Sequence, residues 1–397
     1  MSWKEDTDCC SLDGILCDIE TSDVIGLDLS YSGLYRNNSS NGNQLIGPTP
    51  SYVNALQNLA YTGLALNNLN ATTPSWIFDQ QFLEGLEVSD NELIGHINQF
   101  QSKSLVDIAL DNNKLNDSIS SSVFEQLNLA SLSLSLNNFS GTVVLHLFSK
   151  LKDLVLLDLS HNNLSINNAF KVNLSFSQVW TLMLSGCNLS EFLDLFSNKF
   201  QRSLPIPPPS SIVLLLSNNK LIGEIPPLIC NLSTITILDL SNNSFNGNIP
   251  KCMGNFSNLH VLDLRKNKFS GTIPRSFAKH NPLKTFNFNK NELEGPIPRS
   301  LVNCMMLEVL DIDHNKVIDP FPYWLQSHPE LQVLILHSNK FYSSISDCLE
   351  TKHCFPKLKI FDISNNKFGG PLPAWYFKNL QAMKDVSEAE RKLQYMG

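Results

Sequence analysis

One eleven-residue frame recurs along almost the whole chain and constrains its fold more than any other feature. The frame reads L-x-x-L-x-L-x-x-N-x-(L/F). Its asparagine falls at Asn67, Asn91, Asn113, Asn137, Asn162, Asn198, Asn219, Asn243, Asn267, Asn291, Asn315, Asn339 and Asn366. Two further copies carry Ser32 and Cys187 in that slot, and from Asn219 to Asn339 the spacing is a constant 24 residues. Such a period is the signature of stacked repeats and argues against separate globular domains.

The frame also explains why leucine and asparagine are both abundant, with 62 and 44 copies among 397 residues. In L-x-L the alternate leucines point inward from a short strand, and stacked strands form one long parallel sheet. The asparagine then turns the chain, and its amide can bond backbone groups of its own turn and of the next. The pattern predicts a β-rich α/β leucine-rich-repeat solenoid, a curved right-handed superhelix with a parallel concave sheet.

Several copies continue as L-x-G-x-I-P, for example from Leu221 to Pro226 and from Phe269 to Pro274. This extension resembles the plant-specific class of leucine-rich repeats, which implies a second short strand in each such unit. Segments such as NFSNLHVLDLRKNKFSGTIP and LVNCMMLEVLDIDHN closely resemble plant receptor-like proteins of the disease-resistance type.

The segment from Trp3 to Cys17 precedes the repeats and resembles the cysteine cap of plant leucine-rich-repeat receptors, with Leu12 where those receptors usually carry tryptophan. The resemblance implies that Cys10 pairs with Cys17, whereas Cys9 would pair with an upstream cysteine that this chain lacks. No signal peptide precedes Met1, and together these features suggest a truncated ectodomain.

The resulting organisation has three parts. Residues 1–23 form a partial N-terminal cysteine cap, residues 24–383 form about 15 repeats, and residues 384–397 begin an island-like or disordered tail. Only 11 residues separate Cys187 from Asn198, which is too short for a coil of this kind, so an irregular coil is expected near 187–209.

The remaining cysteines divide into expected disulfides and expected buried thiols. Cys230 and Cys252 occupy near-equivalent sites on neighbouring convex turns, and Cys348 and Cys354 bracket a small insertion, so each pair is expected to be bonded. Cys187 and Cys304 are expected to be buried thiols.

Glycosylation sequons also suggest the secretory pathway. They lie at Asn37, Asn38, Asn70, Asn116, Asn138, Asn163, Asn173, Asn188, Asn231, Asn242 and Asn255. Since an asparagine-rich repeat creates such triplets by composition, about half are expected to carry glycans, and the third of the chain after Asn255 offers barer surface.

Composition and motifs exclude several functions. The net charge of −8 argues against nucleic-acid binding, and no apolar stretch is long enough to cross a membrane. No nucleophile-elbow, metalloprotease, phosphate-loop or kinase motif is present, and no C-x-x-C spacing suggests a metal. The aspartates that recur in L-D-L are repeat consensus, so the sequence predicts neither an enzyme nor a cofactor.

A concave sheet offers a binding surface instead. The positions that indicate what this surface binds are those that depart from the consensus L-D-L-S-x-N. Together with the consensus aspartates, the candidate ligand-binding residues are Asp239, Asp263, Arg265, Lys266, Asn287, Asn289, Lys290, Asp311, Asp313, His314, Ile335 and His337, with Leu215 and Met183 as apolar spots. Such a mixed-charge strip suits a peptide or protein surface. His314 and His337 are either a pH-responsive pair or two solvated imidazoles.

The family resemblance implies a plant receptor-like protein that senses a pathogen elicitor or peptide. It would act at the extracellular face of the plasma membrane and signal through an adaptor receptor kinase, anchored by a transmembrane helix absent from this chain. Two alternatives stay open: a secreted inhibitor of a pathogen wall-degrading enzyme, and a truncated gene product without function.

Overall fold

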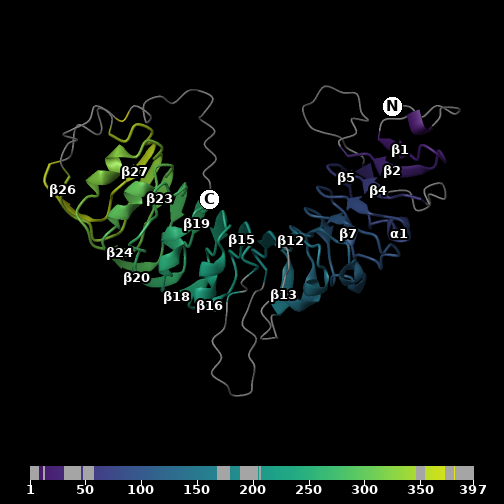
Figure 1. The fold of residues 1–397 in the computed structure, drawn as a ribbon, viewed down its shortest axis with the longest axis horizontal. Coiled ribbons are helices and arrows are strands. Elements are labelled where there is room, and N and C mark those ends of the chain that lie inside the picture. The colour runs from purple at the N-terminus through teal and green to yellow at the C-terminus, as the bar shows by residue number, and fades with distance from the viewer. Residues whose placement is uncertain are drawn as a thin grey trace, which may run out of the picture. The chain divides into compact units, whose positions relative to one another are not determined.

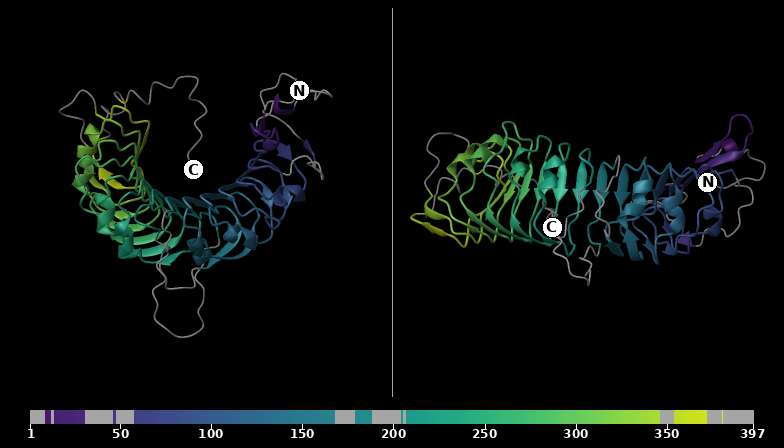
Figure 2. Two further views of the ribbon diagram at one scale, coloured as in Figure 1. Left: turned by 45° about the vertical axis from the view of Figure 1, so that its right-hand side comes forward. Right: turned by 60° about the horizontal axis from the view of Figure 1, so that its bottom comes forward.

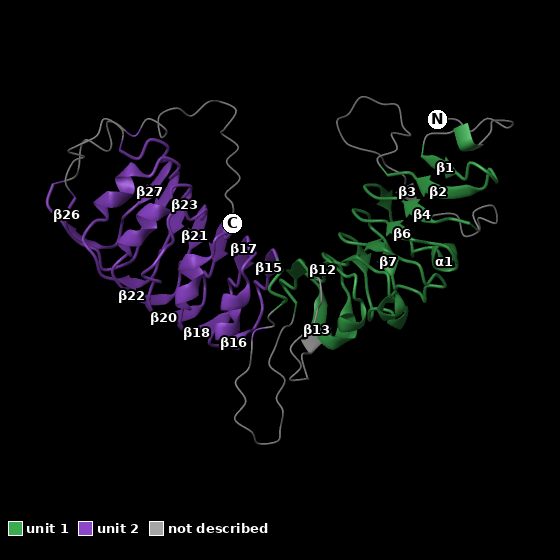
Figure 3. Cartoon of the chain, in the orientation of Figure 1, with its two compact units in different colours: residues 1–194, 205–211 green, residues 195–204, 212–397 purple. Residues whose placement is uncertain are grey.

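The computed structural model describes residues 9–11, 14–30, 46–47, 58–167, 179–187, 204, 207–345, 354–371 and 380. The chain divides into two compact units, residues 1–194 with 205–211 and residues 195–204 with 212–397 (Figure 3). Both units are built from successive coils. Nearly every coil contributes one three-residue strand to the main sheet. Figure 2 shows these strands side by side within each unit.

In the first unit the main sheet begins with an antiparallel pair and continues in parallel. Its strands are β1 (Ile15–Cys17), β2 (Val24–Asp28), β4 (Tyr61–Gly63), β6 (Gly85–Glu87), β8 (Asp107–Ala109), β10 (Ser131–Ser133), β12 (Leu156–Asp158) and β14 (Thr181–Met183). The Cys10–Cys17 disulfide ties the preceding 3₁₀ turn, η1 (Cys9–Ser11), to β1. β1 therefore covers the open edge of the first parallel strand, which is what a cap must do.

In the second unit every strand of the main sheet is parallel to its neighbour. The strands are β15 (Val213–Leu215), β17 (Ile237–Asp239), β19 (Val261–Asp263), β21 (Thr285–Asn287), β23 (Val309–Asp311), β25 (Val333–Ile335) and β27 (Ile360–Asp362). Their central residues pair in register, as Leu238 with Leu262, and both side chains are fully buried. The predicted solenoid with a parallel sheet is confirmed.

The repeated asparagine forms the predicted ladder of buried amides. The Nδ2 group of Asn267 donates to the carbonyls of Leu264 and Arg265 in its own turn and of Leu240 in the coil before it, at 3.0–3.2 Å. Its Oδ1 accepts the N–H of Phe245, also in the preceding coil. The expectation of a bond to the next coil was wrong in direction, because the Asn267 amide lies against the Leu240 carbonyl and the Phe245 N–H of the preceding coil.

A second set of short strands runs along the coils, as the L-x-G-x-I-P extension predicts. β16 (Ile222–Gly223), β18 (Ser244–Asn248), β20 (Lys268–Thr272), β22 (Glu292–Gly295) and β24 (Lys316–Val317) form one sheet. Two-stranded sheets join β3 (Ile46–Gly47) to β5 (Asn68–Leu69), β7 (Ile94–Gly95) to β9 (Lys114–Leu115), β11 (Ser140–Val144) to β13 (Asn163–Asn167), and β26 (Tyr342–Ser344) to β28 (Lys367–Gly369). The repeated glycine adopts a positive φ, 72° at Gly271 and at Gly295, which explains why the extension requires glycine.

Short helical turns complete the outer part of the coils. They are α1 (Ser75–Phe78) and the 3₁₀ turns η2 (Ser121–Glu125), η3 (Leu145–Lys150), η4 (Pro227–Asn231), η5 (Lys251–Asn255), η6 (Arg299–Asn303) and η7 (Tyr323–Ser327). Cys230 of η4 is bonded to Cys252 of η5 across neighbouring coils. Within the second unit, β15, β19, β23 and β27 lie on the inner side of an arc, with β16, β18, β20 and β24 on the outer side (Figure 1).

The other cysteines differ in how they are used. Cys187 and Cys304 are buried free thiols, and burial raises the pKa of each to about 12. Cys187 occupies the asparagine slot, and its Sγ donates to the carbonyl of Leu159 in the preceding coil. Cys354 is disulfide-bonded.

Several predictions lie outside the described residues. These are Cys348, the sequons at Asn37, Asn38, Asn173 and Asn188, most of the irregular coil at 187–209, and the tail at 384–397.

Candidate functional site

The twelve predicted binding residues lie together in the second unit, in three rows that cross the main sheet. The first row contains the last residue of each strand: Asp239, Asp263, Asn287, Asp311, Ile335 and Asp362. The second row, two positions later, contains Ser241, Arg265, Asn289, Asp313, His337 and Ser364. The third contains Asn242, Lys266, Lys290, His314, Ser338 and Asn365, all with φ near +50°. These three rows are called the strip below.

The aspartates of the first row have a structural role that the sequence did not reveal. One carboxylate oxygen, Oδ1, accepts the backbone N–H two residues later: from Ser241 to Asp239, from Arg265 to Asp263 and from Asp313 to Asp311, at 2.9–3.0 Å. Each aspartate therefore closes the turn that follows its strand. This turn-closing role explains why L-D-L recurs, without any acid–base chemistry. The second oxygen of each carboxylate, Oδ2, remains available for contacts within the strip.

The centre of the strip is electrostatically coupled. Desolvation raises the pKa of Asp263 to about 6, with a further contribution from Asp239, while the backbone N–H of Arg265 opposes the shift. The Arg265 Nε lies 3.3 Å from the Asp263 Oδ2, and the two side chains are 31% and 14% exposed. Burial also raises the pKa of Asp311, whose Oδ2 accepts a bond from the Asn289 Nδ2 at 2.7 Å.

Asn289 provides the clearest sign of an unfilled contact in the strip. Its Nδ2 is used by Asp311, but its Oδ1 is buried and has no hydrogen-bond partner among the described residues. A buried acceptor without a partner costs roughly 1–3 kcal/mol unless a water or a bound molecule supplies a donor.

The structure adds residues that the sequence interpretation omitted. Asp362, recognisable in the sequence as another consensus L-D-L aspartate but not counted among the binding residues, and Ser364 extend the strip by one coil beyond His337. The first residues of the strands form a further half-buried apolar row, with Val261, Thr285, Val309 and Val333 in register. The sequence contains the signal for this row, since a β-branched residue precedes the central core residue of each of these strands.

The two apolar spots, Met183 and Leu215, each end a strand of the main sheet. Leu215 ends β15 at the position of the first row, whereas Met183 ends β14 in the other unit.

His314 and His337 lie on neighbouring coils with Asp313 beside them. The Asp313 Oδ1 is 2.6 Å from the His314 Nδ1 and 4.0 Å from the His337 Nε2. The ring centroids of the two histidines are 5.2 Å apart, so they form a pair and not two isolated imidazoles.

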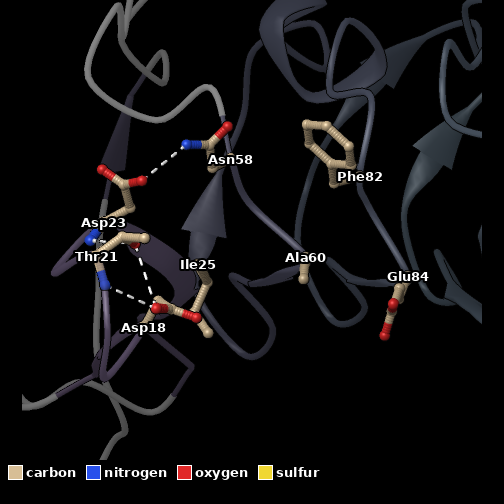
Figure 4. Close-up of a pocket in the computed structure, with 8 residues that line it drawn as sticks. All are labelled: Asp18, Thr21, Asp23, Ile25, Asn58, Ala60, Phe82 and Glu84. Atoms are coloured by element: carbon tan, nitrogen blue, oxygen red, sulfur yellow. Dashed lines mark hydrogen bonds between the residues drawn. The ribbon is translucent and has the colours of Figure 1, made fainter.

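A shallow depression in the first unit was not predicted. It is lined by Asp18, Thr21, Asp23, Ile25, Asn58, Ala60, Phe82 and Glu84 (Figure 4). The Asp18 Oδ1 accepts the backbone N–H groups of Glu20 and Thr21, which lowers the pKa of that carboxyl. Asn58 donates to Asp23 at 3.3 Å. Both aspartates are therefore engaged in holding the loop that follows β1.

No helix formed by the described residues is both long and apolar enough to traverse a lipid bilayer.

Comparison with known families supports the repeat assignment. A family model described as leucine rich repeat matches residues 257–317, and a second model of the same description matches residues 212–232, 234–256 and 357–379.

Curated relatives come from one group of plant proteins. The chain is 34% identical over 242 residues to Receptor-like protein 6 of Arabidopsis thaliana, an alignment that covers 59% of this chain and 21% of that protein. It is 34% identical over 139 residues to Receptor like protein 22 of the same plant, covering 35% of this chain and 17% of that protein. The chain therefore matches about a fifth of the length of these relatives.

Solved structures of plant receptors share the fold. The crystal structure of a TDR receptor superposes with a TM-score of 0.68 at 24% identity, covering 88% of this chain and 65% of that chain. The ectodomain of the Arabidopsis receptor kinase HAESA, in complex with an IDA peptide hormone ligand, superposes with a TM-score of 0.62 at 21% identity, covering 95% and 76%. At this identity the likeness establishes the fold.

Proposed function

Because the chain is a leucine-rich-repeat protein of the plant receptor-like type, we propose that it is an extracellular recognition region that binds a peptide or protein elicitor through the strip. The resemblance to plant receptor-like proteins implies that signalling then passes to a partner receptor kinase. The full-length protein acts at the outer face of the plasma membrane.

The observation that carries this proposal is the composition of the strip. Its rows place carboxylates, amides and the cations Arg265, Lys266 and Lys290 on one continuous surface of short strands. The half-buried apolar row lies beside them, and the Asn289 Oδ1 still needs a donor. An extended peptide offers backbone N–H groups, apolar side chains and charges at matching intervals.

The plant neighbours give this proposal its context. HAESA was crystallised with a peptide hormone and RGFR1 with RGF2, and both have the fold of this chain. The sequence relatives are receptor-like proteins, which supports a receptor and not a secreted inhibitor.

Charge reversal on the strip tests the proposal. We expect Arg265→Glu, Lys266→Glu and Lys290→Glu together to abolish the elicitor response of leaf tissue expressing the full-length protein. The matched control is Lys251→Glu, Lys279→Glu and Arg299→Glu, which changes the net charge equally at exposed residues outside the strip.

The control should retain the response. Equal loss in both triple variants would refute the strip as the binding surface. Failure to recover any receptor kinase with the full-length protein by affinity purification from leaf tissue would refute the signalling partner.

A further inference from the structure

We propose that Asp313, His314 and His337 bind one divalent transition-metal ion of the zinc type at the C-terminal end of the strip. Their three ligand atoms lie within 4.8 Å of one another, and the three residues come from two neighbouring coils. Imidazole nitrogen and carboxylate oxygen are the donors that zinc and its neighbours in the transition series accept. The inference does not depend on the proposed function.

Hydrogen bonding around His337 fixes which ring nitrogen is free. The Ser364 hydroxyl donates its proton to the Asp362 Oδ1 at 2.6 Å. That hydroxyl lies 2.6 Å from the His337 Nδ1, and because its own proton is already used, it must accept a proton from that nitrogen. A neutral His337 therefore carries its lone pair on Nε2.

The free nitrogen faces another acceptor. The His337 Nε2 lies 4.0 Å from the Asp313 Oδ1, and that oxygen also lies 2.6 Å from the His314 Nδ1. A cation between the His337 Nε2 and the Asp313 Oδ1 satisfies both groups. Hydrogen bonds link Asp362 to Ser364 and Ser364 to the His337 Nδ1. Such bonds to the second ring nitrogen orient a metal-binding histidine.

The local charge suits a divalent ion. Asp313 and Asp362 contribute two negative charges beside the two imidazoles, and no lysine or arginine of the described residues forms an ion pair with Asp313. The side chains are 17% exposed at Asp313, 29% at His337 and 52% at His314, which leaves the ion a route from solvent.

Metal geometry requires only small side-chain movements. Donors around a tetrahedral zinc ion with bonds of about 2.0–2.1 Å lie roughly 3.3 Å apart. To reach this spacing, the 2.6 Å separation between Asp313 and His314 must widen and the 4.0 Å separation between Asp313 and His337 must narrow, each by about 0.7 Å. Three protein donors leave a fourth position for water or for a donor of a bound molecule.

No metal motif is visible in the sequence, because the two histidines are 23 residues apart. They meet only because one coil stacks on the next, with the His314 N–H donating to the His337 carbonyl at 3.1 Å.

Calorimetric titration of the purified, tag-free chain with ZnCl₂ at pH 7.5 tests the site. We expect saturable binding of one ion, with no competing binding of Mg²⁺, which prefers oxygen ligands. His314→Asn and His337→Asn should each weaken zinc binding at least about tenfold, and Ser364→Ala about tenfold through loss of orientation.

His161→Asn is the matched control. His161 has φ +55° against +48° for His314, and its N–H donates to the Ser185 carbonyl as that of His314 does to His337. Asparagine tolerates this backbone conformation, so both variants keep the turn. The next coil carries Ser185 where His337 would stand, so His161→Asn should leave zinc affinity unchanged.

Two results would overturn the inference. One is the absence of saturable zinc binding, which would mean that a proton on His337 neutralises the carboxylates. The other is zinc binding that survives His337→Asn, which would place the ion elsewhere.

Discussion

The ladder asparagines show how one side chain can stabilise two coils at once. Each fully formed position makes hydrogen bonds to three carbonyl groups and one N–H, as at Asn267. The loss of an interior ladder residue therefore removes several buried hydrogen bonds at once.

We expect Asn267→Ala to lower the free energy of unfolding by about 2–4 kcal/mol, because buried backbone groups lose their partners. Urea unfolding followed by circular dichroism measures this change. Asn246→Ala, at an exposed position of β18, is the control and should change stability by less than about 0.5 kcal/mol. Similar losses in both variants would contradict the role given to the ladder.

Asp263 should make stability depend on pH in a specific direction. Its pKa is raised to about 6 in the folded protein, so the folded state holds the proton more tightly than the unfolded chain. This contribution is fully present below the unfolded pKa of about 3.9 and is lost as the pH rises through 6.

Asp263→Asn removes that titration and keeps an oxygen for the N–H of Arg265. Relative to the variant, the wild type should lose about 2–3 kcal/mol of unfolding free energy between pH 4 and pH 7. Unfolding curves of both proteins at several pH values measure the difference. A stability difference that does not change with pH would contradict the shift.

At the scale of the element, each coil is too small to bury its own apolar face, so stability comes from its neighbours. Phe245 and Phe269, which follow successive ladder asparagines, are buried and stack with ring centroids 6.0 Å apart. On the outer side, the disulfide between η4 and η5 also joins neighbouring coils, here covalently.

Removal of that disulfide should affect stability mainly through the unfolded chain. The bond closes a loop of 22 residues, so we expect the double variant Cys230→Ser, Cys252→Ser to lose about 3 kcal/mol. Thermal unfolding with and without dithiothreitol gives the measurement. The reductant should lower the midpoint of the wild type more than that of the double variant, and an equal effect on both would contradict the prediction.

At the scale of the whole molecule, the distribution of sequons defines which surface can carry glycans. All seven sequon asparagines that the structure describes are exposed: Asn70, Asn116, Asn138, Asn163, Asn231, Asn242 and Asn255. Asn242 is also a member of the third row, so a glycan there would border the strip at its first coil.

Peptide mapping by mass spectrometry of the chain secreted from plant cells should find N-glycans among these seven asparagines. No N-glycan is expected after Asn255, so coils β19 to β27 should present a bare surface to a partner. Asn242→Gln should remove one glycan and leave the fold intact. A glycan on any later asparagine would contradict the assignment.

The leucine and asparagine spacing determined the coil, the parallel sheet and the second strands, because these depend on which residues alternate along a short segment. It also indicated twelve strip residues, since a departure from a repeated consensus is visible in one dimension. Tertiary structure alone decided the direction of the ladder bonds and the meeting of Asp313 and His314 with His337. These depend on what one coil places above another, and contacts between residues more than 20 positions apart arise only from stacking.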